Sequence, residues 1–433
     1  MSDSRFTTLD DWLRWQETLH PQTIELGLER VRTVWRQLQP EPSPYITITV
    51  GGTNGKGSCV ALLEAMLQAA GYRVGAYTSP HLLRYNERIR IEGVEASDAA
   101  LCRAFARIDA ARRDVSLTYF EFGTLAALEL FREANVEVAL LEVGLGGRLD
   151  AVNIIDADAA LVVSIDLDHT EWLGPDRNSI GYEKAGIYRA DRPAICADPD
   201  PPPRLIEQAR MLNANLLQVG RDYDFTSTGP SWRWWSGDLH FDELPLPRLV
   251  GTHQIGNAAA ALMALASLGD RLSVPLSAIR TGLLQAKLLG RFQSIPGPVE
   301  WILDVAHNPL GAAILATNLQ ERPCSGRTWA ICGLLADKDA HGIIHPLLNV
   351  IDDWYPVTLT GPRGRSGEDL AQLLRAAGAR VQVAADPAAA GQIAQAAANP
   401  GDRIVVLGSF HTVAPVLTAQ PWQSNSPPPS REA

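Results

Sequence analysis

The chain has little of what would tie it to a membrane, to nucleic acid or to an oxidising compartment. It has no apolar run of about 18 residues, the length that a membrane-spanning helix needs, and its polar first thirty residues contain no signal-peptide core. It has no lysine- or arginine-rich run, and its formal net charge of −11 argues against nucleic acid and anionic membranes as partners. The five cysteines are scattered without paired or metal-type spacing, which indicates reduced thiols. We expect a cytoplasmic monomer with no nucleic-acid or membrane partner.

The hydrophobic pattern predicts an α/β fold with a doubly wound, mostly parallel sheet, because short apolar runs alternate with helical periodicity. A segment rich in Gly, Pro, Asp and aromatic residues, 215–250, predicts a small antiparallel excursion whose tryptophans pack into a core. The expected strands are 45–50, 73–78, 136–143 and 159–165, and the expected helices are 57–70, 97–112, 121–134, 203–213, 255–268 and 275–286.

The length of 433 residues exceeds what one hydrophobic core normally serves, so we expect two domains with a substrate cleft between them. Pro296, Gly297 and Pro298 interrupt regular structure, and strand and helix alternation restarts beyond them. The later strands are expected near 299–305, 328–333, 354–359, 380–384 and 403–408. We predict a P-loop domain at 1–292, a smaller Rossmann-like α/β domain at 293–418, and a disordered tail at 419–433.

The stretch YITITVGGTNGKGS at 45–58 has the pattern of a phosphate-binding loop. A β-branched run enters a glycine-rich turn, and Lys56 and Ser58 follow at the start of an amphipathic helix. Glycines let backbone N–H groups point inward, and the helix start adds positive charge to that of the lysine. The loop is a variant, because Val50 stands where the strict motif has glycine and Gly57 separates the lysine from the hydroxyl. An ordinary glycine-rich turn is the weaker interpretation.

Three polar residues follow the ends of expected strands, where parallel α/β sheets bind ligands. Glu142 closes one apolar run, His169 follows another, and Ser79 follows the strand ending near 77. Together they could supply ligands for the magnesium ion that accompanies a bound triphosphate. Taken alone, Glu142 also fits a salt-bridged carboxylate and His169 an ordinary loop histidine. Lys184 by itself reads as an exposed lysine in a helical ion pair.

Seven short sequence blocks follow one another in the same order as in folylpolyglutamate synthase, and the chain resembles this family. The resemblance is strongest to the bifunctional bacterial form, which is also a dihydrofolate synthase. Any one block would indicate only the wider class of ATP-dependent amide ligases related to the Mur enzymes. One departure is Leu289, where the family often has proline before the Gly-Arg pair. The blocks are GTNGKGS at 52–58, TSPHL at 78–82, LEVGLGGRLDAVN at 141–153, DHTEWLG at 168–174, EKAGI at 183–187, GRF at 290–292 and DVAHNP at 304–309.

The resemblance implies roles for residues at matching positions. For ATP, which the resemblance implies as co-substrate, the expected contacts are Asn54, Gly55, Lys56, Gly57, Ser58, Asn257, Arg291 and Asp304. For the pterin-containing substrate they are Thr53, Thr118, Tyr119, Phe120, Glu121, Leu149, Asp150 and Ala151. For two Mg²⁺ ions they are Ser79, Glu142, His169 and Lys184, the last as a carbamate. Lys56, Lys184 and His169 are the expected catalytic residues.

The implied reaction joins L-glutamate to dihydropteroate and to reduced folates. A carboxylate attacks the γ-phosphorus of ATP, an acyl phosphate forms, and the amine of glutamate displaces phosphate. Two alternatives stay open: folylpolyglutamate synthase activity alone, and a Mur-type ligase acting on a cell-wall nucleotide precursor, although the first forty-odd residues look too short for a separate UDP-binding domain. A nucleotide-driven switch is a third class, but it would not need the second α/β domain.

Overall fold

A computed structural model describes residues 5–38 and 44–425, and it divides the chain into two compact units. The first unit is formed by residues up to Arg248 together with Gln254–Lys287. The second is formed by Leu249–His253 and the chain from Leu288 onward. The chain therefore passes from the first unit to the second between residues 287 and 288, close to the predicted boundary, but a short segment at 249–253 also belongs to the second unit.

The first unit is built on an eight-stranded sheet with the order β4-β3-β2-β5-β1-β6-β7-β8. Along the order β2-β5-β1-β6-β7-β8 every neighbouring pair of strands is parallel. At the other edge, β3 pairs antiparallel with β2, and β4 pairs antiparallel with β3. The predicted parallel sheet is thus confirmed, and β3, β4, β7 and β8 are additions to it. The strands are β1 Ile46–Gly51, β2 Val74–Tyr77, β3 Ile89–Ile91, β4 Val94–Glu95, β5 Val138–Glu142, β6 Ala159–Val162, β7 Pro193–Cys196 and β8 Asn215–Gln218.

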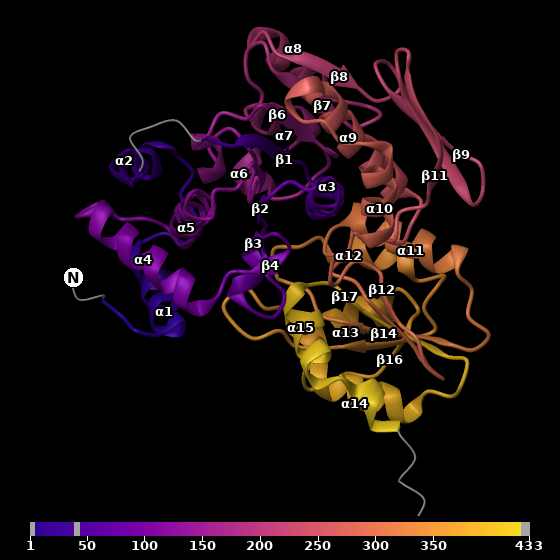
Figure 1. The fold of residues 1–433 in the computed structure, drawn as a ribbon. Coiled ribbons are helices and arrows are strands. Elements are labelled where there is room, and N and C mark those ends of the chain that lie inside the picture. Colours follow the sequence, from indigo (N-terminus) through magenta and orange to yellow (C-terminus); the bar gives the residue numbers. More distant parts are fainter. Residues whose placement is uncertain (1–4, 39–43, 426–433) are drawn as a thin grey trace, which may run out of the picture. The chain divides into compact units, whose positions relative to one another are not determined.

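Helices surround this sheet, as its doubly wound pattern requires. Helices α1, α2, α4 and α5 pack on one another, while α3, which follows the phosphate loop, packs against α10 (Figure 1). The helices are α1 Leu9–Leu19, α2 Glu29–Leu38, α3 Lys56–Ala69, α4 Asp98–Arg112, α5 Tyr119–Glu133, α6 Thr170–Leu173, α7 Arg177–Ala185, α8 Pro203–Met211, α9 His253–Leu268 and α10 Leu276–Gln285, with short 3₁₀ turns at Tyr85–Arg88, Ala151–Ile154 and Gly269–Arg271.

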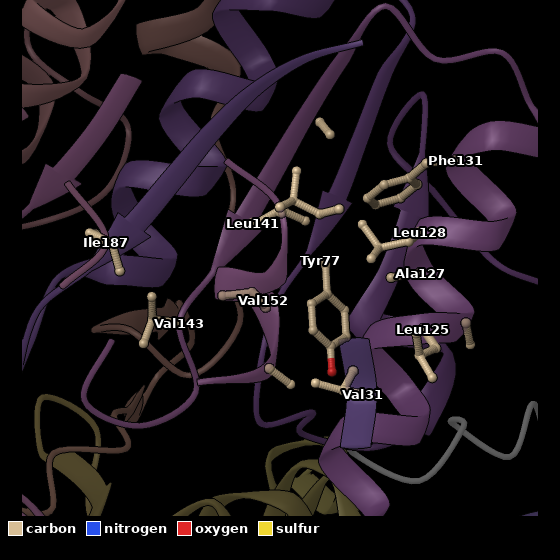
Figure 2. Packing of buried hydrophobic residues seen from close by; sticks show 14 of the residues in the cluster. Val31, Tyr77, Leu125, Ala127, Leu128, Phe131, Leu141, Val143, Val152 and Ile187 are labelled. Carbon is tan, nitrogen blue, oxygen red and sulfur yellow. The ribbon is translucent and has the colours of Figure 1, made fainter. Parts of the chain in front are cut away.

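The core between α5 and the sheet explains why this sequence packs so closely. Tyr77 of β2 and Leu141 of β5 point toward Leu128 and Phe131 of α5 (Figure 2). Gly75, two residues before Tyr77, faces the same ring, and a Cβ there would lie 2.5 Å from Phe131 Cδ1. Only glycine allows the helix to approach this strand so closely. The packing fixes the carboxyl ends of β2 and β5, where candidate ligands begin.

The aromatic segment forms the predicted antiparallel excursion, with strand order β11-β10-β9. The excursion begins later than the predicted residue 215, because residues 215–218 form β8, a parallel strand of the main sheet. Trp232 and Trp234 are fully buried, and Trp234 stacks on Phe241 with ring centroids 5.4 Å apart. The indole N–H of Trp234 also donates to the carbonyl of Ala259 at 3.1 Å. These tryptophans therefore have the predicted packing role. The strands are β9 Asp224–Ser227, β10 Ser231–Ser236 and β11 Leu239–Pro245.

The second unit contains a six-stranded sheet with the order β12-β13-β17-β14-β15-β16, which is parallel except at β12. This is the predicted second α/β domain. Its strands are β12 Gln293–Ile295, β13 Glu300–Leu303, β14 Thr328–Cys332, β15 Asp353–Pro356, β16 Arg380–Val381 and β17 Arg403–Leu407; its helices are α11 Pro309–Glu321, α12 Ala340–Ile344, α13 Gly367–Ala376, α14 Pro387–Ala397 and α15 Phe410–Ala419, with 3₁₀ turns at His345–Leu347 and Pro421–Asn425.

The disordered tail was predicted to begin at residue 419, but the ordered chain continues beyond that residue. The chain forms a 3₁₀ turn at Pro421–Asn425, and the Trp422 ring packs on Trp301 with centroids 5.4 Å apart. Pro421 is buried as well. The composition of this segment is typical of disorder, but it contains Pro421 and Trp422, which pack against the folded chain. The prediction is therefore wrong up to Asn425. The rest of the predicted tail, 426–433, lies outside the described residues.

Candidate active site

The phosphate loop joins β1 to α3 through two glycines with positive φ. Gly52 has φ +144° and Gly55 has φ +85°, both in the region that favours glycine. At Gly55 there is also no room for a side chain, since a Cβ would lie 2.7 Å from Val163 Cγ1 and 2.9 Å from Asn257 Oδ1. Helix α3 then starts at Lys56, and the first N–H groups of a helix have no partner within it. The loop is therefore a backbone cradle suited to an anion.

Lys56 is folded over this cradle. Its ammonium donates to the carbonyls of Gly52 at 2.9 Å and Thr53 at 3.1 Å. A nucleotide phosphate would offer full negative charges in place of these neutral acceptors. Ser58 lies in the first turn of α3 and is buried. The loop residues expected to bind ATP thus share one strand-to-helix turn.

A second segment, 164–166, supports the cradle. Thr53 N–H donates to the carbonyl of Ser164 at 2.7 Å, and Asn54 N–H donates to the Ser164 hydroxyl at 3.0 Å. Thr53 Oγ1 accepts from the N–H of Asp166 at 3.0 Å and donates to its carbonyl at 3.1 Å. The structure therefore uses Thr53, expected to bind the pterin substrate, to hold the loop to the segment that follows β6.

The expected metal ligands lie at neighbouring strand ends. The strands β2, β5, β1 and β6 are consecutive in the sheet and parallel, so Ser79, Glu142, the phosphate loop and His169 all follow the same edge. The buried Glu142 carboxylate accepts the N–H of Ser79 at 3.2 Å, which joins two of the four expected ligands directly. His169 has a left-handed backbone, φ +51°, at the start of α6. The hydroxyl and carboxylate oxygens are donors that suit Mg²⁺ or Mn²⁺.

No group of three His, Cys, Asp or Glu side chains is preassembled for a metal ion within residues 5–38 and 44–425. The donor set still fits, because a phosphate-bound divalent ion takes much of its coordination from phosphate oxygens and water and only one or two carboxylates from the protein. The buried Glu142 at the strand end, next to Ser79, supplies that carboxylate.

Lys184 is buried, so its interpretation as an exposed surface cation is wrong. It lies in the last turn of α7 with 3% of its surface exposed. Burial, reinforced by the nearby ammonium of Lys56 and opposed by Asp168, lowers the pKa of Lys184 to about 7. An amine with this pKa is half neutral at neutral pH and can react as a nucleophile. The proximity of Lys56 also places Lys184 beside the phosphate loop.

The expected pterin segment opens helix α5. Thr118 and Glu121 form a capping box, in which each side chain accepts the backbone N–H of the other. Glu121 also forms an ion pair with Arg30, Oε1 to Nη2 3.2 Å. Two of the four residues are thus needed to start the helix. The aromatic members remain half-buried: Tyr119 contacts the Tyr85 ring edge to face at 5.5 Å between centroids, and Phe120 lies against Gly144.

Phe120 brings this segment to the glycine-rich turn at 144–151. A Cβ on Gly144 would lie 2.6 Å from the Phe120 ring, so the two expected pterin segments lie side by side. In the same turn, burial raises the pKa of Asp150 to about 7, although its carboxylate accepts the N–H groups of Leu145 at 2.9 Å and Val152 at 3.0 Å. The adjacent Ala151 is buried and Leu149 is half-buried. Flat rings beside a carboxyl group form a suitable surface for a pterin.

Arg148, in the same turn, does not pair with Asp150. Its guanidinium binds Glu183 at 2.8 Å, and its backbone N–H donates to the Glu183 carbonyl at 2.8 Å. A side chain at Gly186 would collide with Arg148. The turn is therefore fixed to α7, the helix that carries Lys184. Sequence alone could not reveal this contact or the pairing of Arg30 with Glu121, because both join residues far apart in the chain.

Asn257 belongs to the first unit. Its side-chain amide donates to Gln254 Oε1 at 2.9 Å, and its position beside Gly55 places it at the phosphate loop. The neighbouring His253 belongs to the second unit, and burial lowers its pKa to about 4. Asn257 therefore lies with the loop residues that are also expected to contact ATP.

Arg291 and Asp304 lie together in the second unit. Burial raises the pKa of Asp304, while the Arg291 guanidinium and the N–H groups of Phe292 and Ala306 oppose the shift. Those N–H groups donate to the carboxylate at 2.8 and 2.7 Å. Arg291 itself lies over the Phe410 ring, 5.4 Å from its centroid. Asp304 thus already has a structural role in fixing the turn after β13.

The loop after Asp304 leads into α11. His307 Nδ1 lies 2.8 Å from the carbonyl of Val305, and Asn308 Oδ1 caps the helix by accepting the N–H of Gly311 at 2.8 Å. Leu289, which stands where the family often has proline, is about half exposed.

In the described part of the chain, no helix has the length and apolar character to cross a membrane.

Comparisons with known proteins agree with this architecture. Residues 290–410 match the family described as Mur ligase, glutamate ligase domain, so a P-loop α/β unit is followed here by the second domain of a Mur-type ligase. The dihydrofolate synthase/folylpolyglutamate synthase of Escherichia coli is 47% identical over 410 residues, 94% of each chain. The chain belongs to this family.

Two solved structures extend the comparison. The structure of E. coli FolC in complex with DHPP and ADP has a TM-score of 0.92 and 46% identity, and the match covers 97% of this chain and 99% of that one. A bifunctional folylpolyglutamate synthase/dihydrofolate synthase with Mn, AMPPNP and L-glutamate bound has a TM-score of 0.89 and 45% identity, with 97% and 100% covered. The predicted family and fold are confirmed.

Proposed function

We propose that the protein is an ATP-dependent ligase that adds L-glutamate to dihydropteroate, forming dihydrofolate, and to reduced folates, forming polyglutamates. The observation that carries this function is the 47% identity to a bifunctional relative over 94% of both chains. Similar structures hold ADP with DHPP, and Mn with AMPPNP and L-glutamate, which are the groups such a reaction requires. A Mur-type ligase acting on a cell-wall nucleotide is the less supported alternative.

In the first half-reaction a carboxylate oxygen of the substrate attacks the γ-phosphorus, and ADP leaves. Lys56 and the N–H groups at the start of α3 stabilise the charge on the transferring group. Ser79, Glu142, His169 and Lys184 as a carbamate would hold the divalent ions, which would supply further neutralisation of the phosphate charge. The product is an acyl phosphate on the folate carboxyl.

In the second half-reaction the amine of glutamate attacks the acyl carbon, and inorganic phosphate leaves from the tetrahedral intermediate. Exclusion of water protects the acyl phosphate from hydrolysis. We assign the pterin ring to the two neighbouring segments that include Tyr119, Phe120 and Asp150, because they combine flat apolar surface with a carboxyl group of pKa about 7. Asn257, Arg291 and Asp304 are proposed nucleotide contacts.

Phosphate release tests this function. Purified protein is mixed with ATP and Mg²⁺, and dihydropteroate, a reduced folate, a UDP-muramyl precursor and L-glutamate are added in turn. We expect release to depend on both a folate-type acid and glutamate. Release driven by the UDP-muramyl precursor, or release independent of glutamate, would contradict the proposal. We also propose that the enzyme is a cytoplasmic monomer, which size-exclusion chromatography with light scattering and cell fractionation would check.

A further inference from the structure

The segment that leads from β6 to His169 is held by an ion pair outside the nucleotide loop. Ile165, at the centre of this segment, has both of its backbone groups bound by side chains. Its N–H donates to Asp198 Oδ2 at 2.7 Å, and its carbonyl accepts from Arg177 Nε at 2.8 Å. Arg177 and Asp198 also bind each other, Nη2 to Oδ1 3.1 Å. The three residues form a closed ring of contacts.

The ring joins three different pieces of the first unit. Ile165 lies between β6 and α6, Asp198 follows β7, and Arg177 is the first residue of α7. Arg177 Nη2 also donates to the main-chain carbonyl of Asp200 at 2.8 Å, and Nη1 donates to the Asp200 carboxylate at 3.0 Å, so each nitrogen of its guanidinium has an acceptor. Asp198 is only 5% exposed. A forked cation is needed here, because a lysine ammonium could not contact Ile165 and the 198–200 segment in the same geometry.

Both elements anchored by Arg177 carry proposed metal ligands. His169 is four residues beyond Ile165, and Lys184 is seven residues along α7 from Arg177, a rise of about 10 Å. His169 has φ +51°, a conformation that a non-glycine residue keeps only when its surroundings hold it. On the other side, Thr53 holds Asp166 to the phosphate loop. The chain before His169 is therefore held from two directions.

We propose that Arg177 and Asp198 are positioning residues for divalent-metal binding, which act by fixing the segment that presents His169 relative to the helix that presents Lys184. This inference rests on the proposed function, because it assumes the metal role of His169 and Lys184. Outer residues that orient metal ligands typically change metal affinity by about tenfold to a hundredfold when they are replaced. A pair that served stability alone would change the unfolding temperature without changing metal affinity.

The test measures Mn²⁺ binding to the full chain in the presence of AMPPNP, by the electron paramagnetic resonance signal of free Mn²⁺. We expect Arg177→Lys to weaken Mn²⁺ binding about tenfold, and AMPPNP binding without metal to change less than twofold. Asp198→Asn, which can still accept the Ile165 N–H, should shift Mn²⁺ binding in the same direction and covers the case in which Arg177→Lys fails to fold.

The matched control is Arg192→Lys. Arg192 also pairs with an aspartate that accepts a backbone N–H, since Asp158 binds Arg192 at 3.2 Å and the N–H of Thr47 at 2.9 Å, but this pair lies at the opposite ends of the strands. We expect unchanged Mn²⁺ affinity there. Unchanged Mn²⁺ affinity in Arg177→Lys would overturn the positioning role if Glu142→Gln loses Mn²⁺. Normal Mn²⁺ binding in Glu142→Gln would instead overturn the metal site itself, and the positioning role with it.

Discussion

Carbamylation of Lys184 is the prediction that the structure makes most quantitative. Only a neutral amine reacts with carbon dioxide. A lysine with the ordinary pKa of 10.5 is neutral in about three of ten thousand molecules at pH 7, whereas a pKa of about 7 makes about half of them neutral. Burial and the neighbouring Lys56 therefore increase the reactive fraction by about a thousandfold. The product is a carboxylate, which can serve as an oxygen ligand for a second metal ion.

The assay is carbon-13 NMR of the protein in ¹³C-bicarbonate buffer. We expect a carbamate resonance at pH 7.5 to 8, and we expect it to weaken below about pH 6 as the amine becomes protonated. Lys184→Arg should lack the resonance and should be inactive, because a guanidinium cannot form this carbamate. Lys184→Ala should be inactive and partly rescued by formate or acetate. The control is Lys287→Arg, because Lys287 is exposed and belongs to no proposed site.

A wild-type spectrum without a carbamate resonance that depends on Lys184 would refute this reasoning. Full ligase activity in Lys184→Arg would do the same, since it would show that the chemistry requires only a cation or nothing at this position.

Three further predictions concern the same site. Lys56→Ala should lower glutamate-dependent phosphate release by at least about a hundredfold and leave the unfolding temperature nearly unchanged, because the side chain is only half-buried and its ammonium donates to carbonyls of its own loop; near-normal turnover would remove the loop from the mechanism. Glu142→Gln and His169→Ala should each raise the Mg²⁺ concentration for half-maximal activity at least about tenfold, and unchanged magnesium curves in both would show that the metal assignment is wrong. Lys184→Met, measured without carbon dioxide, tests the buried amine through protein stability. The pKa of Lys184 is about 7 in the folded chain and 10.5 in the unfolded chain. Between pH 7 and pH 10.5 the unfolded chain therefore binds more protons, and the stability of the wild-type protein rises with pH. The variant should therefore gain most below pH 7, by at most about 5 kcal/mol, and lose this advantage near pH 10.5, which urea unfolding at several pH values would check; a stability difference independent of pH would contradict the lowered pKa.

Much of the fold was predictable because its elements follow local patterns. The run before the phosphate loop is β-branched, and the glycines, Lys56 and Ser58 follow within a few residues, so both the strand-to-helix turn and its chemistry are visible in one short segment. The alternation of apolar strands with helical periodicity likewise predicted the parallel sheets of both units. The strand ends that carry Ser79 and Glu142 follow from the same pattern, because parallel strands end at one edge.

Two features of the site could have been read from the sequence but were missed. Lys184 is four residues after the buried Ile180, and this spacing places both on one face of α7. The spacing of Thr118 and Glu121 is that of a capping box, which explains why both side chains are occupied at the start of α5.

Other features depend on contacts between distant segments, which no local pattern records. Arg30 lies 91 residues before its partner Glu121, and Ile165 lies 33 residues before Asp198. The prediction that the ordered chain ends at residue 418 was wrong for a similar reason. The packing of Trp422 on Trp301 orders a segment whose composition is typical of disorder.

Product analysis tests the bifunctional ligase most directly. Purified protein is incubated with ATP, Mg²⁺ and L-glutamate and with either dihydropteroate or a reduced folate, and the products are identified by mass spectrometry. Both substrates present the same flat ring to the segments around Tyr119 and Phe120, so we expect dihydrofolate from the first mixture and a folate longer by one glutamate from the second. Formation of only the lengthened folate would contradict the bifunctional reaction, and formation of neither product would contradict the proposed function as a whole.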